Sequence, residues 1–271
     1  MHVNRNDFLI DRAIEREKMK SVQLIKKEHI GFLYLNSPKT KNALKSEDMA
    51  LIRGILDREA KSDIYALIIS GRGDVFCSGA DFSEITSIIG KNKKDQGLQS
   101  NDMSKLCDAI QSFPLPTVCA LNGSAYGGGV EIACACDFRI AVSNIEIMVP
   151  PAKIGIHYHP AGIKRFLNIF GASATKRLLL TATKLSEKEL KNVGFFDEII
   201  NEGENVIERA HDFIKLCKEL SPEAVRGMKL SINDMVMDSV NTQSLNSRIK
   251  HTLESQYLER QLKSIKEKNS K

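Results

Sequence analysis

The chain has 271 residues, of which 42% are hydrophobic and 27% charged, and its formal net charge is +5. This composition is ordinary for a globular protein and excludes a disordered chain, a collagen and a simple repeat. No apolar run reaches the roughly 18 residues that a membrane helix needs, and residues 1–20 lack the apolar core of a signal peptide. We therefore expect a cytoplasmic protein with no membrane partner.

The N-terminal part of the chain predicts a strand, strand, helix, strand order. Residues 22–36 contain two short β-rich runs around a charged turn, which is typical of a hairpin. A helix is expected over residues 47–60 with Ser46 as its N-cap, and residues 64–70 (IYALIIS) read as a buried strand.

The middle of the chain continues the alternation. Strands are expected at residues 117–122 and 138–143, with a short helix at 128–134 after a glycine turn, and one last strand at 195–200. Alternating strands and helices in this order predict an α/β protein with a layered parallel sheet.

The C-terminal part is predominantly helical. Ser186 and Glu189 have the spacing of a capping box, and helices are expected over residues 204–220, 222–237 and 243–268. We divide the chain into an N-terminal extension (1–20), a core (21–220) and a C-terminal helical region (221–271).

The cysteines do not have the paired CxxC spacing of a zinc site, and they mostly lie among apolar neighbours. We therefore expect reduced core thiols and no metal site. The alternating pair His157 and His159 lacks a third ligand at metal spacing, so both histidines are better read as polar groups near a pocket. The cysteines are Cys77, Cys107, Cys119, Cys134, Cys136 and Cys217.

Two glycine-rich segments each follow a predicted strand. Residues 71–82 (GRGDVFCSGADF) follow the first buried strand, and residues 122–133 (NGSAYGGGVEIA) lead into the short helix. Glycines at such turns leave backbone N–H groups open to a ligand, and Glu131 is a carboxylate in an otherwise apolar stretch. Neither segment has the glycine spacing of a dinucleotide site, a P-loop or a nucleophile elbow. Together they can supply two N–H donors to one oxygen, which is an oxyanion hole.

The two segments belong to a series of motifs that follow one another along the chain: Asn36-Ser37-Pro38-Lys39, Asn42-Ala43-Leu44, Phe76 to Asp81, Asn122 to Glu131, Cys136-Asp137, Pro150 to Gly155, Leu185 to Gly194 and Ser221 to Lys229. In this combination and order they resemble the crotonase (enoyl-CoA hydratase/isomerase) superfamily, over about residues 21–240.

The resemblance implies a spiral of ββα units with a C-terminal helical trimerisation region, assembled as a homotrimer or a dimer of trimers. It implies an acyl-CoA thioester as substrate, with coenzyme A as part of that substrate, no separate cofactor and no nucleic-acid partner. The N–H groups of Ala80 and Gly128 would hold the thioester carbonyl as it becomes an enolate, and Glu131 would be the acid/base. The further substrate- or CoA-binding positions are Lys39, Lys41, Ala43, Ser78, Asp81, Phe82, Tyr126, Gly127 and Pro151.

The sequence departs from the family at the second glutamate of its hydratases. That position falls on Pro151, which cannot transfer a proton. Residues 150–162 instead resemble the methylmalonyl-CoA decarboxylase branch, whose tyrosine matches Tyr158, although that branch has a histidine where this chain has Ala80. A histidine or a water is the alternative proton-transfer group in place of the missing carboxylate.

Three functions therefore stay open. Hydration or dehydration of an enoyl-CoA with Glu131 as the acid/base is the family's default, and the enzyme would then be a lyase. Decarboxylation of a malonyl-type thioester using Tyr158 is the second, and a catalytically silent CoA-thioester binding protein is the third. The polar segment within residues 85–108 is expected to influence substrate choice.

Overall fold

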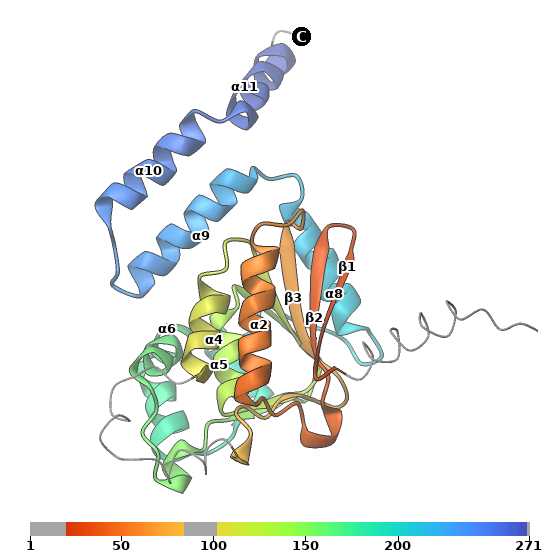
Figure 1. Ribbon diagram of the computed structural model, residues 1–271, viewed down its shortest axis with the longest axis vertical. Helices are drawn as coiled ribbons and strands as arrows, with labels where there is room; N and C mark the ends of the chain where they lie inside the picture. Colours follow the sequence, from red (N-terminus) through yellow and green to blue (C-terminus); the bar gives the residue numbers. More distant parts are fainter. Residues whose placement is uncertain (1–19, 84–101, 270–271) are drawn as a thin grey trace, which may run out of the picture.

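The computed structural model describes residues 20–83 and 102–269 (Figure 1). Residues 1–19, which make up nearly all of the expected N-terminal extension, lie outside the described residues. The same holds for residues 84–101, which include most of the polar segment expected to influence substrate choice.

The ten strands of the described chain form two sheets. They are β1 (Val22–Lys27), β2 (Ile30–Leu35), β3 (Ala66–Gly71), β4 (Val75–Cys77), β5 (Thr117–Leu121), β6 (Ser124–Tyr126), β7 (Phe138–Ala141), β8 (Glu146–Met148), β9 (Leu185–Ser186) and β10 (Glu198–Ile199). The larger sheet has the order β1-β2-β3-β5-β7-β10 and is parallel except for the β1–β2 hairpin. The smaller has the order β4-β6-β8-β9, in which β9 runs antiparallel.

Helices and short 3₁₀ turns connect the strands. They are η1 (Pro38–Thr40), α2 (Ser46–Glu59), α4 (Asp102–Gln111), α5 (Gly128–Ala135), η2 (Pro151–Ile154), α6 (Pro160–Leu180), α7 (Glu187–Asn192), α8 (Val206–Ile214), η3 (Lys215–Cys217), α9 (Pro222–Val236), α10 (Thr242–Leu253) and α11 (Gln256–Asn269). The pairs β3–β4, β5–β6 and β7–β8 each give one strand to each sheet and are followed by α4, α5 and α6. This succession is the predicted arrangement of ββα units.

Alternation along the strands of the larger sheet divides the apolar side chains between two cores. Leu67 and Ile69 face the core that α2, α4 and α5 cover, whereas Ile68 and Val118 face the core that α8 covers. Successive side chains of a strand point to opposite faces, so both faces of this sheet are buried.

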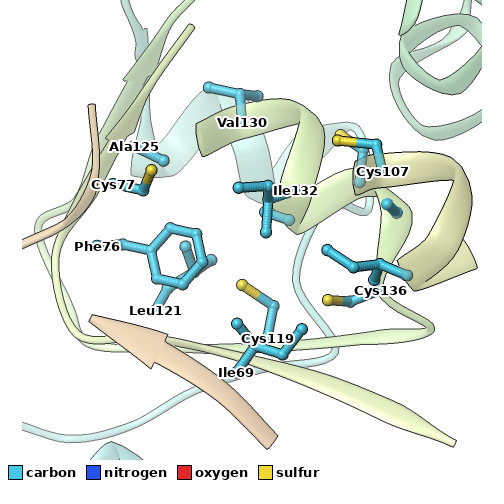
Figure 2. Packing of buried hydrophobic residues seen from close by; sticks show 14 of the residues in the cluster. Ile69, Phe76, Cys77, Cys107, Cys119, Leu121, Ala125, Val130, Ile132 and Cys136 are labelled. Atoms are coloured by element: carbon cyan, nitrogen blue, oxygen red, sulfur yellow. The ribbon is translucent and has the colours of Figure 1, made fainter. Parts of the chain in front are cut away.

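The cysteines belong to these cores, as predicted. Five of the six are buried and Cys217 is half-buried. Figure 2 shows Cys119 and Cys136 in the larger core together with Ile69, Leu121 and Ile132. Burial raises the pKa of the Cys77 thiol to about 12, so this side chain stays protonated at neutral pH.

Four details of the predicted elements are wrong. The helix α2 is capped by Lys45 rather than Ser46, because the Asp48 carboxylate accepts a hydrogen bond from the Lys45 N–H (3.0 Å) and Ser46 is already helical. The strand expected at 195–200 is only the two-residue β10. The helix expected at 204–220 starts at Val206, since Asn205 caps it, and ends at Ile214 before a 3₁₀ turn. The helix expected at 243–268 is two helices, which break after Leu253.

The C-terminal helices leave the body of the molecule (Figure 1). Helix α9 is attached to the core by Lys229, whose ammonium group donates to the Leu115 carbonyl (2.8 Å) and to the Asp137 carboxylate (2.6 Å). Helix α10 packs on α9, and α10 and α11 project beyond it. Within the described ranges, no helix combines the length and the apolar character that crossing a membrane requires.

Candidate active site

The two glycine-rich turns lie against each other. Gly79 follows β4 with a φ of +90°, and a Cβ at this position would lie 2.6 Å from the backbone nitrogen of Gly128. Gly127 precedes α5 with a φ of +52°. A Cβ on Gly129 would lie 2.3 Å from the Cys77 carbonyl oxygen. Only residues without a side chain allow this approach, so the glycines bring the end of β4 to the N-terminus of α5.

Two backbone N–H groups are open at this junction. Ala80 forms a parallel bridge with Leu44, in which the Leu44 N–H donates to the Gly79 carbonyl and the Asp81 N–H donates to the Leu44 carbonyl (both 2.8 Å). The Ala80 N–H therefore points away from Leu44. Gly128 is the first residue of α5, where an N–H has no partner within the helix. Neither N–H donates to another residue in the part of the chain that the structure describes, and both residues are partly exposed.

Glu131 lies one turn into α5 with 2% of its surface exposed. Its Oε1 is 2.7 Å from Nη1 of Arg165, which is equally buried, and its Oε2 accepts a hydrogen bond from the Tyr158 hydroxyl (2.8 Å). Both carboxylate oxygens thus have partners from the segment that leads into α6 and from α6 itself. This satisfies the requirement that a buried charge be paired and hydrogen-bonded.

Tyr158 packs its ring against Phe166, with ring centroids 5.1 Å apart. Burial and the neighbouring Glu131 carboxylate raise the pKa of the Tyr158 phenol well above its usual value, so the phenol keeps its proton at neutral pH. Gly162 makes room for this ring: a Cβ there would lie 2.4 Å from a Tyr158 ring carbon and 3.0 Å from the carboxyl carbon of Glu131.

The expected CoA-binding residues come from two segments that lie side by side. The buried Asn42 amide donates to the carbonyls of Val75 and Phe76 (2.8 and 3.1 Å), and the Ser78 N–H donates to the Lys41 carbonyl (2.9 Å). These bonds bring η1 and the residues after it to the end of β4. The expected positions on the two segments are Lys39, Lys41, Ala43, Ser78, Ala80, Asp81 and Phe82.

The side chains on these segments differ in exposure. Lys39 and Lys41 are exposed, and Phe82 is 68% exposed. Asp81 accepts hydrogen bonds from the Ser83 hydroxyl and the Ser83 N–H, which lower the pKa of its carboxyl group.

The remaining expected residues lie around the glycine junction without entering the Glu131 cluster. Tyr126 directs its hydroxyl at Glu146 (3.3 Å), and Pro151 begins the turn η2. His159 caps α6 by accepting from the Ala161 N–H (3.4 Å), and its Nδ1 is 3.1 Å from the Ser104 hydroxyl. The exposed His157 is placed with its Nδ1 2.7 Å from the Tyr158 carbonyl. Neither histidine contacts the Glu131 carboxylate.

Sequence reasoning missed the cationic partner of Glu131. Besides Glu131, Arg165 contacts Gln111 (Nε to Oε1, 2.8 Å) and the Asp108 carboxylate. A charged residue directly before Phe166, on the apolar side of a helix, was the available signal. It did not identify the partner, because α4, α5 and α6 come from distant parts of the sequence.

The fold and this site define an α/β protein with a buried carboxylate behind a glycine-lined junction of two backbone segments. The model of the enoyl-CoA hydratase/isomerase family matches residues 26–270, and the chain belongs to this family. The chain is 31% identical over 185 residues to the crotonyl-CoA hydratase of Syntrophomonas wolfei, covering 67% of this chain and 69% of the relative. It is 28% identical over 228 residues to the ethylmalonyl-CoA decarboxylase of Mus musculus, covering 82% and 70%.

The fold is also that of solved structures. A crystal structure of an enoyl-CoA hydratase from Bacillus anthracis superimposes with a TM-score of 0.80 at 24% sequence identity, over 92% of this chain and 97% of that one. The predicted crotonase fold is thereby confirmed, with its helical C-terminal region. The boundaries of the three segments stay a prediction.

Proposed function

We propose that this enzyme of the enoyl-CoA hydratase/isomerase family hydrates an enoyl-CoA, and catalyses the reverse dehydration, with Glu131 as its acid/base. The proposal rests on one observation: the Glu131 carboxylate is buried one turn into α5 and is paired with Arg165 at 2.7 Å. An ion pair favours the ionised form of a carboxyl group, and the ionised form is the one that accepts a proton from water.

The thioester carbonyl would be held by the N–H groups of Ala80 and Gly128. Their open N–H groups on segments in contact support this assignment, since two such donors stabilise a developing enolate oxygen. The α5 dipole adds partial positive charge at Gly128. In hydration the water oxygen bonds to the β-carbon, Glu131 takes the water proton, and the enolate collapses as Glu131 returns a proton to the α-carbon.

Coenzyme A enters as part of the substrate, and no separate cofactor is proposed. The exposed Lys39 and Lys41 lie on the segment that borders Ser78, where their positive charge suits the phosphates of the CoA moiety. Ala43, Asp81 and Phe82 complete this proposed CoA-binding edge. Tyr126, Gly127 and Pro151 are the proposed borders of the acyl pocket.

Decarboxylation of a malonyl-type CoA thioester is the second candidate, favoured by the Tyr158 hydroxyl at 2.8 Å from Glu131. In this reaction the bond to the departing carboxylate breaks, its electrons form the thioester enolate, and the α-carbon takes a proton from Tyr158, which solvent replaces. Pro151 supplies no second carboxylate, and decarboxylation requires none. The similarity to a decarboxylase named for ethylmalonyl-CoA supports the same candidate.

To decide between hydration and decarboxylation, the purified protein is incubated separately with crotonyl-CoA and with methylmalonyl-CoA, and each thioester is followed by mass spectrometry. Gain of water by crotonyl-CoA supports hydration, and loss of carbon dioxide from methylmalonyl-CoA transfers the proposal to the second candidate. We expect Glu131→Gln to lower kcat for hydration by roughly 10²- to 10⁴-fold, because the amide cannot accept a proton. Tyr158→Phe is the matched test of decarboxylation.

Two outcomes would contradict these assignments. Equal hydration by Glu131→Gln and the wild type would show that another group is the acid/base. Binding of both thioesters without turnover would leave the silent CoA-binding protein as the function.

We further propose that the chain assembles as a homotrimer or a dimer of trimers in the cytoplasm, with no nucleic-acid partner. The exposed apolar side chains of the C-terminal helices, and of the connection between α9 and α10, support the assembly: Met228, Ile232, Met235, Val236, Val240, Ile249, Leu253, Leu262 and Ile265.

A further inference from the structure

One guanidinium group connects the buried carboxylate to the surface of the protein. Arg165 is 2% exposed and reaches Glu131 through Nη1, Gln111 through Nε and Asp108 through Nη2. The Asp108 side chain is 51% exposed. Two carboxylates thus share one cation, and the three charges sum to −1.

We propose that Arg165 is a positioning residue that keeps Glu131 ionised and aims its Oε2 at the Tyr158 hydroxyl, and that Asp108 moderates this effect from the surface. This inference rests on the proposed role of Glu131 as the acid/base. Burial alone favours the neutral form of a carboxyl group, so a carboxylate at this depth needs a fixed opposite charge to act as a base.

The other groups around Glu131 do not replace Arg165. Cys107 on α4 and Cys134 on α5 are buried thiols, and burial raises the pKa of both, so neither carries a charge at neutral pH. Tyr158, ahead of α6, keeps its proton and donates it in a hydrogen bond. Asp108 on α4 is itself an anion. Arg165 is therefore the single cation in direct contact with this carboxylate among the described residues.

The planar guanidinium also fixes direction. Its three nitrogens are each occupied by a different oxygen, from α4 on one side and α5 on the other. Because Oε1 of Glu131 is held by Nη1, the remaining oxygen faces Tyr158, whose ring is seated in the space left by Gly162. A lysine carries the same charge without this fork, so it would restore the charge but less of the aim.

The test compares Arg165→Met and Arg165→Lys with the wild type, using two readouts over a pH series. The first is the infrared band of the protonated Glu131 carboxyl group, identified by its loss in Glu131→Gln. The second is the pH dependence of kcat and KM with crotonyl-CoA. For Arg165→Met we expect the carboxyl band to appear at a pH about one to three units higher than in the wild type. The acid limb of the kcat profile should move upward by the same amount, with KM little changed. Arg165→Lys should recover most of the shift.

The control is Arg139→Met. Arg139 is another buried arginine, and it donates to the carbonyls of Cys136 (3.0 Å) and Phe195 without contacting the Glu131 carboxylate. Its loss should lower the unfolding midpoint but leave the infrared titration and the acid limb unmoved. A purely structural role for Arg165 would give the same result in Arg165→Met, and that would overturn the proposal.

Asp108→Asn tests the proposal independently if Arg165→Met does not fold. Removal of the competing carboxylate leaves the whole Arg165 charge to Glu131, so the carboxyl band should appear at lower pH than in the wild type. An unchanged titration in this half-exposed variant would contradict the proposal. The infrared readout needs no substrate, so it decides the role of Arg165 whether or not the wild type hydrates a thioester. Absence of hydration by the wild type would refute the proposed function and leave the role of Arg165 to the infrared result.

Discussion

Backbone geometry at a single glycine controls where the Ala80 N–H lies. Gly79 combines a φ of +90° with a Cβ position 2.6 Å from the Gly128 nitrogen, so a side chain there strains its own backbone and pushes the two donor segments apart. Gly54, in α2, has open space around its Cβ position. We therefore expect alanine substitution at these two glycines to change the stability of the fold in opposite directions.

We expect Gly79→Ala to destabilise the fold by about 1–3 kcal/mol from strain and to lower kcat by roughly 10²- to 10³-fold through the displaced donor. Gly54→Ala should stabilise the helix by roughly 0.5–1 kcal/mol without an effect on kcat. Denaturant unfolding measures the change in stability of each variant, and turnover of the thioester that the wild type accepts measures the change in kcat. If a folded Gly79→Ala variant kept full turnover, the position of the Ala80 N–H would not matter to the reaction.

The residues of the candidate site were predictable where sequence neighbours fix them. Gly127, Gly128 and Glu131 share one strand–turn–helix segment, so their spacing indicates an open N–H beside a carboxylate. Arg165 and Asp108 were not predictable, because helix packing alone brings them to Glu131. The role of each predicted residue in the reaction stays a prediction.

Local capping signals predict helix starts only when the side chain reaches the backbone. Ser186 and Glu189 form the predicted capping box at α7, with the Glu189 carboxylate accepting from the Ser186 N–H and hydroxyl (both 2.8 Å). At α2 the Asp48 carboxylate accepts from the N–H of Lys45, so Lys45 is the N-cap in place of Ser46. The helix therefore starts one residue earlier than predicted. The smaller sheet escaped prediction because β4, β6 and β8 are three residues each, too short for alternation to be visible.

The α7 capping box has a defined pH dependence. Hydrogen bonds from Ser186, followed by the Arg177 guanidinium, lower the pKa of Glu189 to about 2 from an ordinary 4.5. A lowered pKa means that the unfolded chain takes up the proton first, so the stabilisation is complete above about pH 4.5 and is lost as the pH falls toward 2.

We therefore expect the free energy of unfolding of Glu189→Gln to lie below that of the wild type at neutral pH, with the difference shrinking as the pH falls below about 4.5. Glutamine can still accept the Ser186 hydrogen bonds, so the comparison isolates the charge. Urea unfolding over a pH series measures it, with the exposed Glu219→Gln as the control. A difference that stays constant with pH would mean that the charge is not involved.

At the scale of the whole molecule, α9 presents an apolar face that the described residues leave uncovered. Met228, Ile232 and Met235 are 58%, 59% and 54% exposed and follow one another at helical spacing. Lys229, the residue after Met228, anchors α9 to the core. Apolar surface gathered on one face of a helix is stabilised by burial, at roughly 25 cal/mol per Å², and contact with other copies of the chain would provide it.

We expect light scattering at micromolar concentration to give three or six times the mass of the chain. Ile232→Glu should shift the mass toward that of a monomer, because assembly would bury an unpaired charge. Ile25→Glu, on the edge strand β1 with 49% of the residue exposed, adds the same charge outside the C-terminal helices and should leave the mass unchanged. A monomeric wild type would refute the trimer, whereas equal dissociation of both variants would place the contact elsewhere than on α9.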